Sequence, residues 1–99
     1  SEQSIVTLMR KGKKPEDFII AVINFTPVVH YNYKIGVPYE GTYEEVFNTD
    51  DEKYWGSNQT MKNSELTSYP YEWHNQNHHI VVKVPPLGAT FIKGKDIIR

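Results

Sequence analysis

The chain has 99 residues, a formal net charge of −1 at pH 7 and no cysteine. That length is typical of one domain with one modest core. The balanced charge argues against a nucleic-acid-binding protein, which needs a basic surplus to meet phosphates. Without cysteine, neither disulfides nor thiolate metal sites can hold the fold together. This absence fits a reducing compartment, so we expect a cytoplasmic location. No apolar run reaches the roughly 20 residues that span a membrane, so we expect no membrane partner.

The first half of the chain predicts four strands. Residues 5–10 are the first, and the basic cluster at 10–14 is interpreted as a solvated hairpin tip. Residues 18–25 are apolar at nearly every position, which indicates a central strand buried on both faces. Along residues 29–37, Tyr31 and Tyr33 alternate with polar residues and are both predicted to face the core. A turn at 38–41 precedes a strand at 42–48.

The second half predicts a long loop and further short strands. Residues 49–63 are polar and read as an extended surface loop, a feature that usually carries function or disorder. Strands are expected at 65–69, 79–84 and 89–93, with a turn at 75–77 and a short final pairing at 97–98. No segment shows a convincing helical period. The pattern therefore predicts an all-β fold, a Greek-key-like antiparallel β-sandwich of about seven or eight strands, as a single domain over residues 1–99.

No recognisable catalytic or metal-binding pattern occurs in the sequence. His74 and His78 have the spacing of a helical metal pair, but they fall in a predicted turn and strand, where His78 and His79 face opposite sides. The acidic run at 50–52 is interpreted as three exposed neighbours in a solvated loop. Glycoside chemistry instead needs two carboxyl groups held about 5–9 Å apart across a sugar. We therefore expect no catalytic residue, no metal and no cofactor.

Aromatic side chains in the loops are the ambiguous feature. Tyr54 and Trp55 lie in the long loop, and Trp73 lies in a later turn region. Large rings in loops often serve binding surfaces. They could stack on sugar faces, or they could pack against a neighbouring domain or the ends of the sandwich. Packing is the favoured interpretation, and α-glucan contact is the alternative.

Several motifs in register resemble one known family. They are Asn24-Phe25-Thr26-Pro27, Ile35-Gly36-Val37-Pro38, Gly41-Thr42-Tyr43, Phe47-Asn48-Thr49-Asp50, Tyr54-Trp55-Gly56-Ser57-Asn58 and Pro85-Pro86-Leu87. Together they resemble the C-terminal domain of bacterial 1,4-α-glucan (glycogen) branching enzymes over nearly the whole chain. The chain departs from the family pattern at Trp55, where a second glycine is expected, and at Gly88, which looks like an insertion.

The resemblance implies a non-catalytic domain that packs on and stabilises the catalytic (β/α)8 barrel of the same polypeptide. Such a parent belongs to the α-amylase-like enzymes. It is a retaining glycosyltransferase that moves α-1,4-glucan segments to 6-hydroxyls in glycogen biosynthesis. Its catalytic carboxylates lie in the barrel, so this fragment alone is expected to be inactive, and an isolated chain should expose an apolar patch. The alternatives are a glucan-binding module using the loop aromatics, an Ig-like interaction module, or the equivalent domain of an amylase or debranching enzyme.

Overall fold

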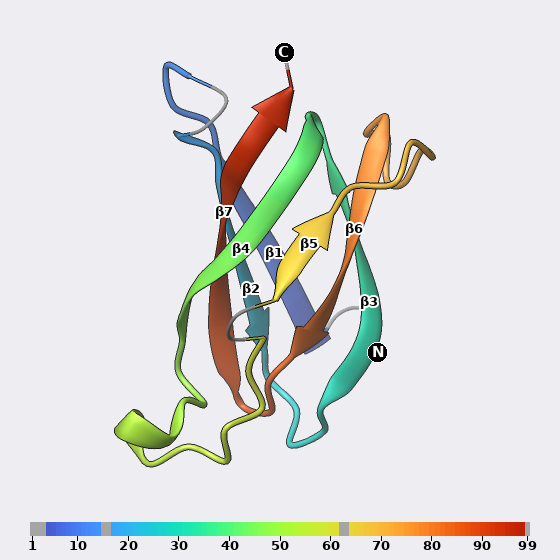
Figure 1. Ribbon diagram of the computed structural model, residues 1–99. Coiled ribbons are helices and arrows are strands. Elements are labelled where there is room, and N and C mark those ends of the chain that lie inside the picture. Colours follow the sequence, from blue (N-terminus) through green and yellow to red (C-terminus); the bar gives the residue numbers. More distant parts are fainter. Residues whose placement is uncertain (1–3, 15–16, 62–63, 99) are drawn as a thin grey trace.

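The computed structural model describes residues 4–14, 17–61 and 64–98. These residues form seven strands and one short 3-10 helix, whose bounds are β1 Ile5–Arg10, β2 Ile19–Asn24, β3 His30–Val37, β4 Glu40–Asn48, η3 Glu52–Tyr54, β5 Glu65–Thr67, β6 His78–Val84 and β7 Gly88–Ile98. Two antiparallel sheets pack face to face (Figure 1), one with the strand order β1-β2-β7-β4-β5 and the other containing β3 and β6. The predicted β-sandwich is confirmed. The segments at 89–93 and 97–98 are parts of one strand, β7, not two pairings.

The core lies between the two sheets and is built from alternate residues of each strand. From β2 and β7, Ile20, Val22 and Ile92 are fully buried, and Phe18 lies beside them just before β2. The opposing layer is contributed by β3 and β6, whose buried side chains are Ile35, Val37, Ile80, Val82 and Val84. This alternation is the pattern expected of sheets with one face in the core. Each of these apolar side chains stabilises the fold by about 1.5–3 kcal/mol relative to remaining exposed.

The prediction that residues 18–25 are buried on both faces is wrong. In β2, Ile20 and Val22 face the core, but Ile19 is 36% exposed, and Phe25 just beyond the strand is 64% exposed. The strand is interior to its sheet, because β1 and β7 pair with its two edges. Its second face, however, has no covering layer among the described residues. The apolar second face of β2 is therefore open to contact with another surface.

A bulge in β3 overturns the predicted orientation of Tyr31. His30 pairs with Val84 and Tyr33 pairs with Val82, so one extra residue is inserted between them. Asn32 adopts a left-handed backbone conformation with φ 57° at this point. An inserted residue changes the face to which the neighbouring side chains point. Tyr33 consequently packs against the core, whereas Tyr31 is 64% exposed.

A second bulge, in β4, reverses the side-chain alternation near the long loop. Glu45 pairs with Ile92 and Phe47 pairs with Phe91, so Val46 is the extra residue. Without the bulge, Glu45 and Phe47 would share a face. With it, Glu45 points inward and Phe47 points to the outer face of the sheet, opposite Phe91. The bulge therefore places Glu45 in the interior beside the long loop and Phe47 on the outer face of the five-stranded sheet.

Candidate functional sites

The loop that follows β4 is organised around the carboxylate of Asp50. Ser57 donates to it twice, from its backbone N–H over 3.0 Å and from its hydroxyl over 2.5 Å, and the Gln59 N–H donates over 2.9 Å. Burial raises the pKa of Asp50, but these hydrogen bonds to the charged form outweigh burial and lower that pKa below its ordinary value. Gly56 packs so tightly on the Asp50 backbone that an added Cβ would lie 2.3 Å from the Asp50 carbonyl carbon. The loop is therefore a compact, hydrogen-bonded structure.

Part of the sequence-based interpretation of the acidic run is wrong. Asp50 and Asp51 are only 9% and 7% exposed, whereas Glu52 is exposed. Asp51 caps the short helix η3 by accepting a hydrogen bond from the Lys53 N–H over 3.0 Å. Backbone and hydroxyl donors to Asp50 and Asp51 offset the repulsion between these adjacent carboxylates. The run has a structural role in the loop.

Glu45 anchors the other end of the same loop. Its carboxylate accepts hydrogen bonds from Asn48 Nδ2 over 2.9 Å, Thr90 Oγ1 over 2.6 Å and the Met61 backbone N–H over 2.9 Å. The bulge at Val46 allows Glu45 and Asn48 to point to the same interior side. The carboxylate therefore connects β4, β7 and the end of the loop.

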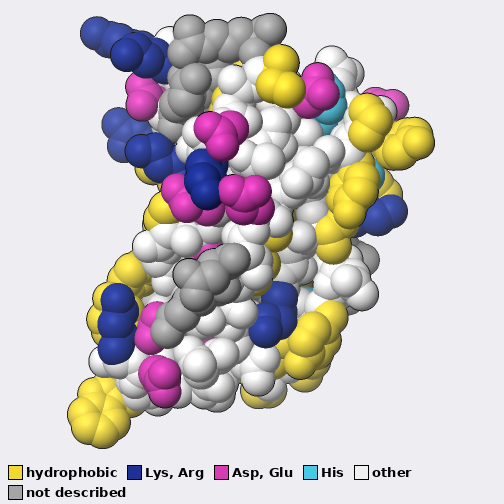
Figure 2. Space-filling view, in the orientation of Figure 1, with side chains coloured by type: hydrophobic (Ala, Val, Ile, Leu, Met, Phe, Trp, Pro, Cys, Tyr) yellow, Lys and Arg dark blue, Asp and Glu magenta, His cyan; other side chains and the backbone are white. Residues whose placement is uncertain are grey.

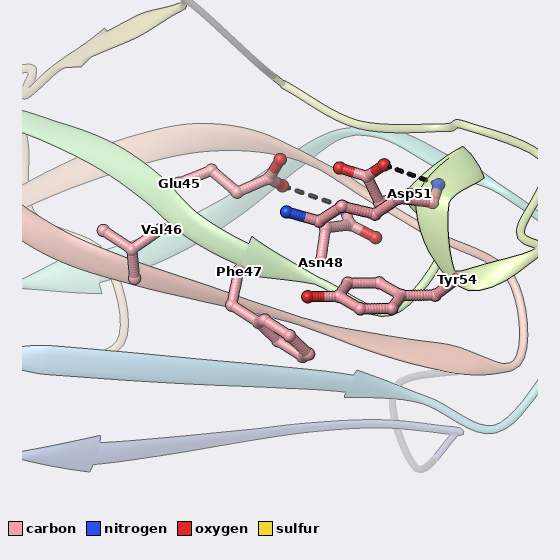
Figure 3. A pocket seen from close by; sticks show the side chains of 7 residues that line it. Glu45, Val46, Phe47, Asn48, Asp51 and Tyr54 are labelled. Carbon is pink, nitrogen blue, oxygen red and sulfur yellow. Dashed lines mark hydrogen bonds between the residues drawn. The ribbon is translucent and has the colours of Figure 1, made fainter.

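A pocket of about 200 Å³ opens between β4 and η3 (Figure 3) and is lined by Glu45, Val46, Phe47, Asn48, Asp51, Lys53 and Tyr54. It contains two carboxylates, the residue type that glycoside chemistry uses. Both are engaged in hydrogen bonds that hold the loop in place, and Asn48 is similarly used. A general acid needs a carboxyl group that can reach the substrate and carry a proton. We therefore assign this pocket a structural role.

The structure places Tyr54 and Trp55 together at the tip of this loop. The Tyr54 ring packs against Phe47 with 5.4 Å between centroids (Figure 3), and Lys53 Nζ lies 5.2 Å from the Tyr54 centroid. Trp55 is 97% exposed and holds a left-handed backbone conformation with φ 69°. That conformation favours glycine, the residue that the family pattern expects here. The exposed Trp55 ring therefore has almost no packing contact within this chain, although its backbone is held in a left-handed conformation.

Replacing Trp55 with glycine is expected to raise the free energy of unfolding of the isolated chain by up to about 1 kcal/mol. Glycine relieves the left-handed strain, and the exposed indole has almost no packing to lose. Trp55→Ala is the matched control, because it removes the ring but retains the strain; its effect should be near zero. Urea denaturation followed by circular dichroism measures both. A large loss of stability in Trp55→Gly would show that the indole packs within this chain.

Trp73 lies elsewhere, on the outer face of the β3–β6 sheet. The segment from Tyr69 to Gln76 crosses that face, and a bridge between Trp73 and Gln76 closes a turn at His74-Asn75 instead of the predicted 75–77. Tyr69 stacks on His79 with 5.2 Å between centroids, and Trp73 lies 6.5 Å from the same imidazole. Figure 2 shows hydrophobic side chains gathered along this side of the molecule. The three sequence-predicted contact residues thus fall into two separate regions.

The histidines do not come together as a metal site. His79 is buried under the aromatic segment, more deeply than the sequence suggested, and its Nδ1 lies 3.0 Å from the Tyr71 carbonyl. Within the described part of the chain, no group of three or more histidine and acidic side chains is placed to hold a metal ion. Among residues 4–14, 17–61 and 64–98, no helix is long and apolar enough to cross a membrane.

The five-stranded sheet presents an apolar outer face that sequence reasoning did not locate. Two rows of directly paired residues cross it, because the register aligns them strand by strand. We call these side chains the outer apolar face: Val6, Leu8, Ala21, Ile23, Phe47, Ala89 and Phe91. The ring centroids of Phe47 and Phe91 are 5.8 Å apart, and the Tyr54 ring extends the face toward the loop. Leu8 is 56% exposed and Phe47 41% exposed. In the sequence, this face was indicated by the second set of alternating apolar residues in 18–25, namely Ile19, Ala21, Ile23 and Phe25.

Comparison with known proteins identifies the family. The sequence model of the alpha amylase C-terminal all-beta domain matches residues 1–95. The chain belongs to this family. It is 52% identical over 95 residues to a protein of Halothermothrix orenii and 41% identical over 97 residues to one of Rubrobacter xylanophilus, both named 1,4-alpha-glucan branching enzyme GlgB. These alignments cover 94% and 98% of this chain but only 15% and 13% of the relatives. A domain of this family therefore corresponds to about one seventh of such an enzyme.

Proposed function

We propose that this chain is the C-terminal domain of a 1,4-α-glucan branching enzyme and packs on the catalytic (β/α)8 barrel of the same polypeptide. The parent would transfer α-1,4-glucan segments to 6-hydroxyls in glycogen biosynthesis, in the cytoplasm. This domain would stabilise the barrel and contribute no catalytic residue. The names and lengths of the relatives support the assignment to a larger enzyme.

The observation that carries the proposal is the outer apolar face. Soluble proteins rarely leave contiguous apolar patches of more than a few hundred Å² uncovered unless another surface binds there. Here a row of paired residues, Leu8-Ala21-Phe91-Phe47, crosses four strands. The core lies on the opposite side of the sheet, so these side chains have no role in the sandwich interior. Covering them gains about 25 cal/mol per Å² of apolar area removed from water.

The edges of the face are suited to a limited interface. The next paired row contains Arg10, Ile19, Lys93 and Glu44, which places charges at one end of the apolar rows. At the other end, Tyr54 continues the apolar surface, and Trp55 follows it in the chain with its ring exposed. An apolar centre with a charged rim is typical of interfaces between folded units. Trp55 is accordingly assigned to the docking surface.

A partner in the same polypeptide makes even a small interface sufficient. Covalent linkage holds two domains at an effective concentration in the millimolar range, so weak contacts are enough to keep them together. Interfaces between domains of one chain are commonly about 600–1,500 Å² and resemble transient protein–protein contacts. The remaining length of the relatives, roughly six to seven times that of the matched part, offers a large surface for such docking.

Two experiments test the proposal. The encoded sequence that precedes Ser1 should contain a (β/α)8 barrel; a start codon directly before Ser1, with no such sequence upstream, would contradict it. The second is to produce the catalytic portion and this 99-residue chain separately and mix them. We expect a complex by analytical ultracentrifugation when this chain is added in the millimolar range, the effective concentration that linkage provides, and a higher melting temperature for the catalytic portion. Absence of any complex at millimolar concentration would count against docking.

A further inference from the structure

An aromatic groove lies on the β3 side of the sandwich, away from the outer apolar face. One part of it, about 340 Å³, is lined by Tyr31, Asn32, Tyr33, Lys34, Trp73 and His74. A second part, about 310 Å³, continues along β3 toward β1 and shares Tyr33, Lys34 and His74 with the first. Because the two hollows share these three lining residues, we treat them together and call them the β3 groove. Tyr31 and Trp73 are its exposed aromatic side chains, at 64% and 36%.

The polar groups of the β3 groove are free of structural hydrogen bonds. Among the described residues, the side chains of Asn32, Lys34, His74 and Gln76 take part in none of the hydrogen bonds within the chain. Lys34 Nζ lies 4.7 Å from the Trp73 ring centroid, a contact that leaves its three N–H donors available. The pocket beside η3 is the opposite case, because its carboxylates and amide are used to hold the loop. Compared with that pocket, the β3 groove offers aromatic faces together with a larger set of unengaged donors and acceptors among the described residues.

The backbone is shaped to present these groups. The bulge at Asn32 turns Tyr31 out of the core, and bulges are frequent where a strand re-aims a side chain beside a site. Gly36 lets the aromatic turn cross β3 closely, because an added Cβ would lie 2.2 Å from the Trp73 carbonyl oxygen. Without that glycine, the turn carrying Trp73 and His74 could not lie against β3. The groove therefore depends on two local features of β3.

We propose that the β3 groove binds a chain of α-1,4-linked glucose residues. A glucose ring has an apolar face that can lie on an aromatic side chain and a rim of hydroxyls that exchange hydrogen bonds with amide, ammonium and imidazole groups. The described residues that line the groove include no carboxylate and one lysine, so its chemistry suits a neutral polyhydroxylated ligand. The choice of α-glucan among such ligands rests on the proposed function of the parent enzyme.

A peptide strand is the competing occupant, because β3 pairs only with β6 among the described strands and leaves one edge open. Strand addition needs a regular row of backbone donors and acceptors. The extra residue at Asn32 interrupts that row in the middle of the groove, and bulges of this kind protect edges from pairing. The exposed Lys34 and Tyr31 side chains beside it also form a poor packing surface for the side chains of an added strand. These features favour the sugar.

Amide chemical shifts of the 99-residue chain, titrated with maltoheptaose, test the proposal. We expect shifts confined to residues 31–36 and 73–76. Tyr31→Ala should weaken the apparent affinity about tenfold, because it removes one stacking ring. Tyr71→Ala is the matched control: Tyr71 is 68% exposed and does not line the groove, so affinity should stay unchanged. Cellohexaose, whose β-linkages give a straighter chain, should bind more weakly.

Several outcomes would overturn the inference. They are the absence of shifts at millimolar maltoheptaose, shifts confined to the loop around Trp55, and equal weakening by the two tyrosine substitutions. Slow amide exchange along the open edge of β3 in the intact polypeptide, together with loss of sugar binding there, would identify a peptide strand as the occupant instead. Shifts around Trp55 would move that ring from the docking surface to sugar contact, but none of these results bears on the paired rows of the outer apolar face. This inference can therefore fail while docking through those rows stands, and docking can fail while this inference stands.

Discussion

Asp50→Asn is expected to destabilise the chain by about 2–4 kcal/mol at neutral pH, because it removes a buried acceptor that organises a whole loop. Three donors from Ser57 and Gln59 converge on this carboxylate. An asparagine of nearly the same shape has one acceptor oxygen and directs an NH2 group at a donor. Hydrogen bonds to a charged group are each worth about 1.5–3 kcal/mol, and some of that loss is recovered when the loop relaxes and water enters. Urea denaturation at pH 7 measures the difference.

Glu52→Gln is the matched control for this substitution. Glu52 is a carboxylate in the same loop, but it is exposed, so its replacement should change stability by less than about 0.5 kcal/mol. If both substitutions had equal small effects, the loop would not depend on the Asp50 carboxylate. The loss of ordered amide signals from residues 56–59 in Asp50→Asn would show directly that the loop has opened.

The effect of Asp50 should depend on pH in a direction that the hydrogen bonds dictate. They hold the pKa of Asp50 in the folded state below the ordinary aspartate value of about 3.9. A lowered folded-state pKa means that the carboxylate contributes its full stabilisation above the unfolded pKa and loses it as pH falls through the folded pKa. The stability gap between the wild type and Asp50→Asn should therefore be largest above about pH 5 and close in stronger acid. A gap that widened on acidification would contradict this assignment.

Leu8→Asp is expected to abolish docking of the domain while leaving the domain itself folded. Leu8 is 56% exposed and lies in the centre of the β1 strand, on the outer apolar face. Its replacement should cost the isolated chain less than about 1 kcal/mol. In a dry interface the new carboxylate would have to lose its water without a partner, at a cost of several kcal/mol. Binding to the separately produced catalytic portion should weaken at least about 100-fold.

Tyr71→Asp provides the control for docking, because Tyr71 is similarly exposed and lies over the other sheet. It should leave the affinity for the catalytic portion unchanged. In the intact polypeptide, Leu8→Asp should also make the link between the domains more sensitive to protease and lower the melting temperature of the catalytic portion. Equal affinities for the two variants would show that the outer apolar face is not the docking surface.

The candidate sites differ in how far sequence could predict them. Trp55 was singled out because it lies in the long loop and stands where the family pattern expects glycine. The structure explains the family preference, because the backbone at this position is left-handed, a conformation that favours glycine. Tyr31 was missed, because strict alternation assigns it to the core. The roles of Asp50 and Asp51 were missed for a related reason: consecutive acidic residues look solvated unless the donors that meet them are known. Those donors come from up to nine residues away, at Gln59.

The sequence by itself determined the fold class, the family and most strand positions. Short apolar runs, proline and glycine at the turns, and alternation along the chain are local properties, and they reflect which residues can be buried in a sheet. Only the tertiary structure decided which face the side chains beside a bulge occupy. The bulges at Asn32 and Val46 each insert one residue relative to a partner strand, and such a shift changes the face while leaving the local pattern unaltered. The physical reason is that register is set by pairing between distant strands, and pairing can be seen only in the folded chain.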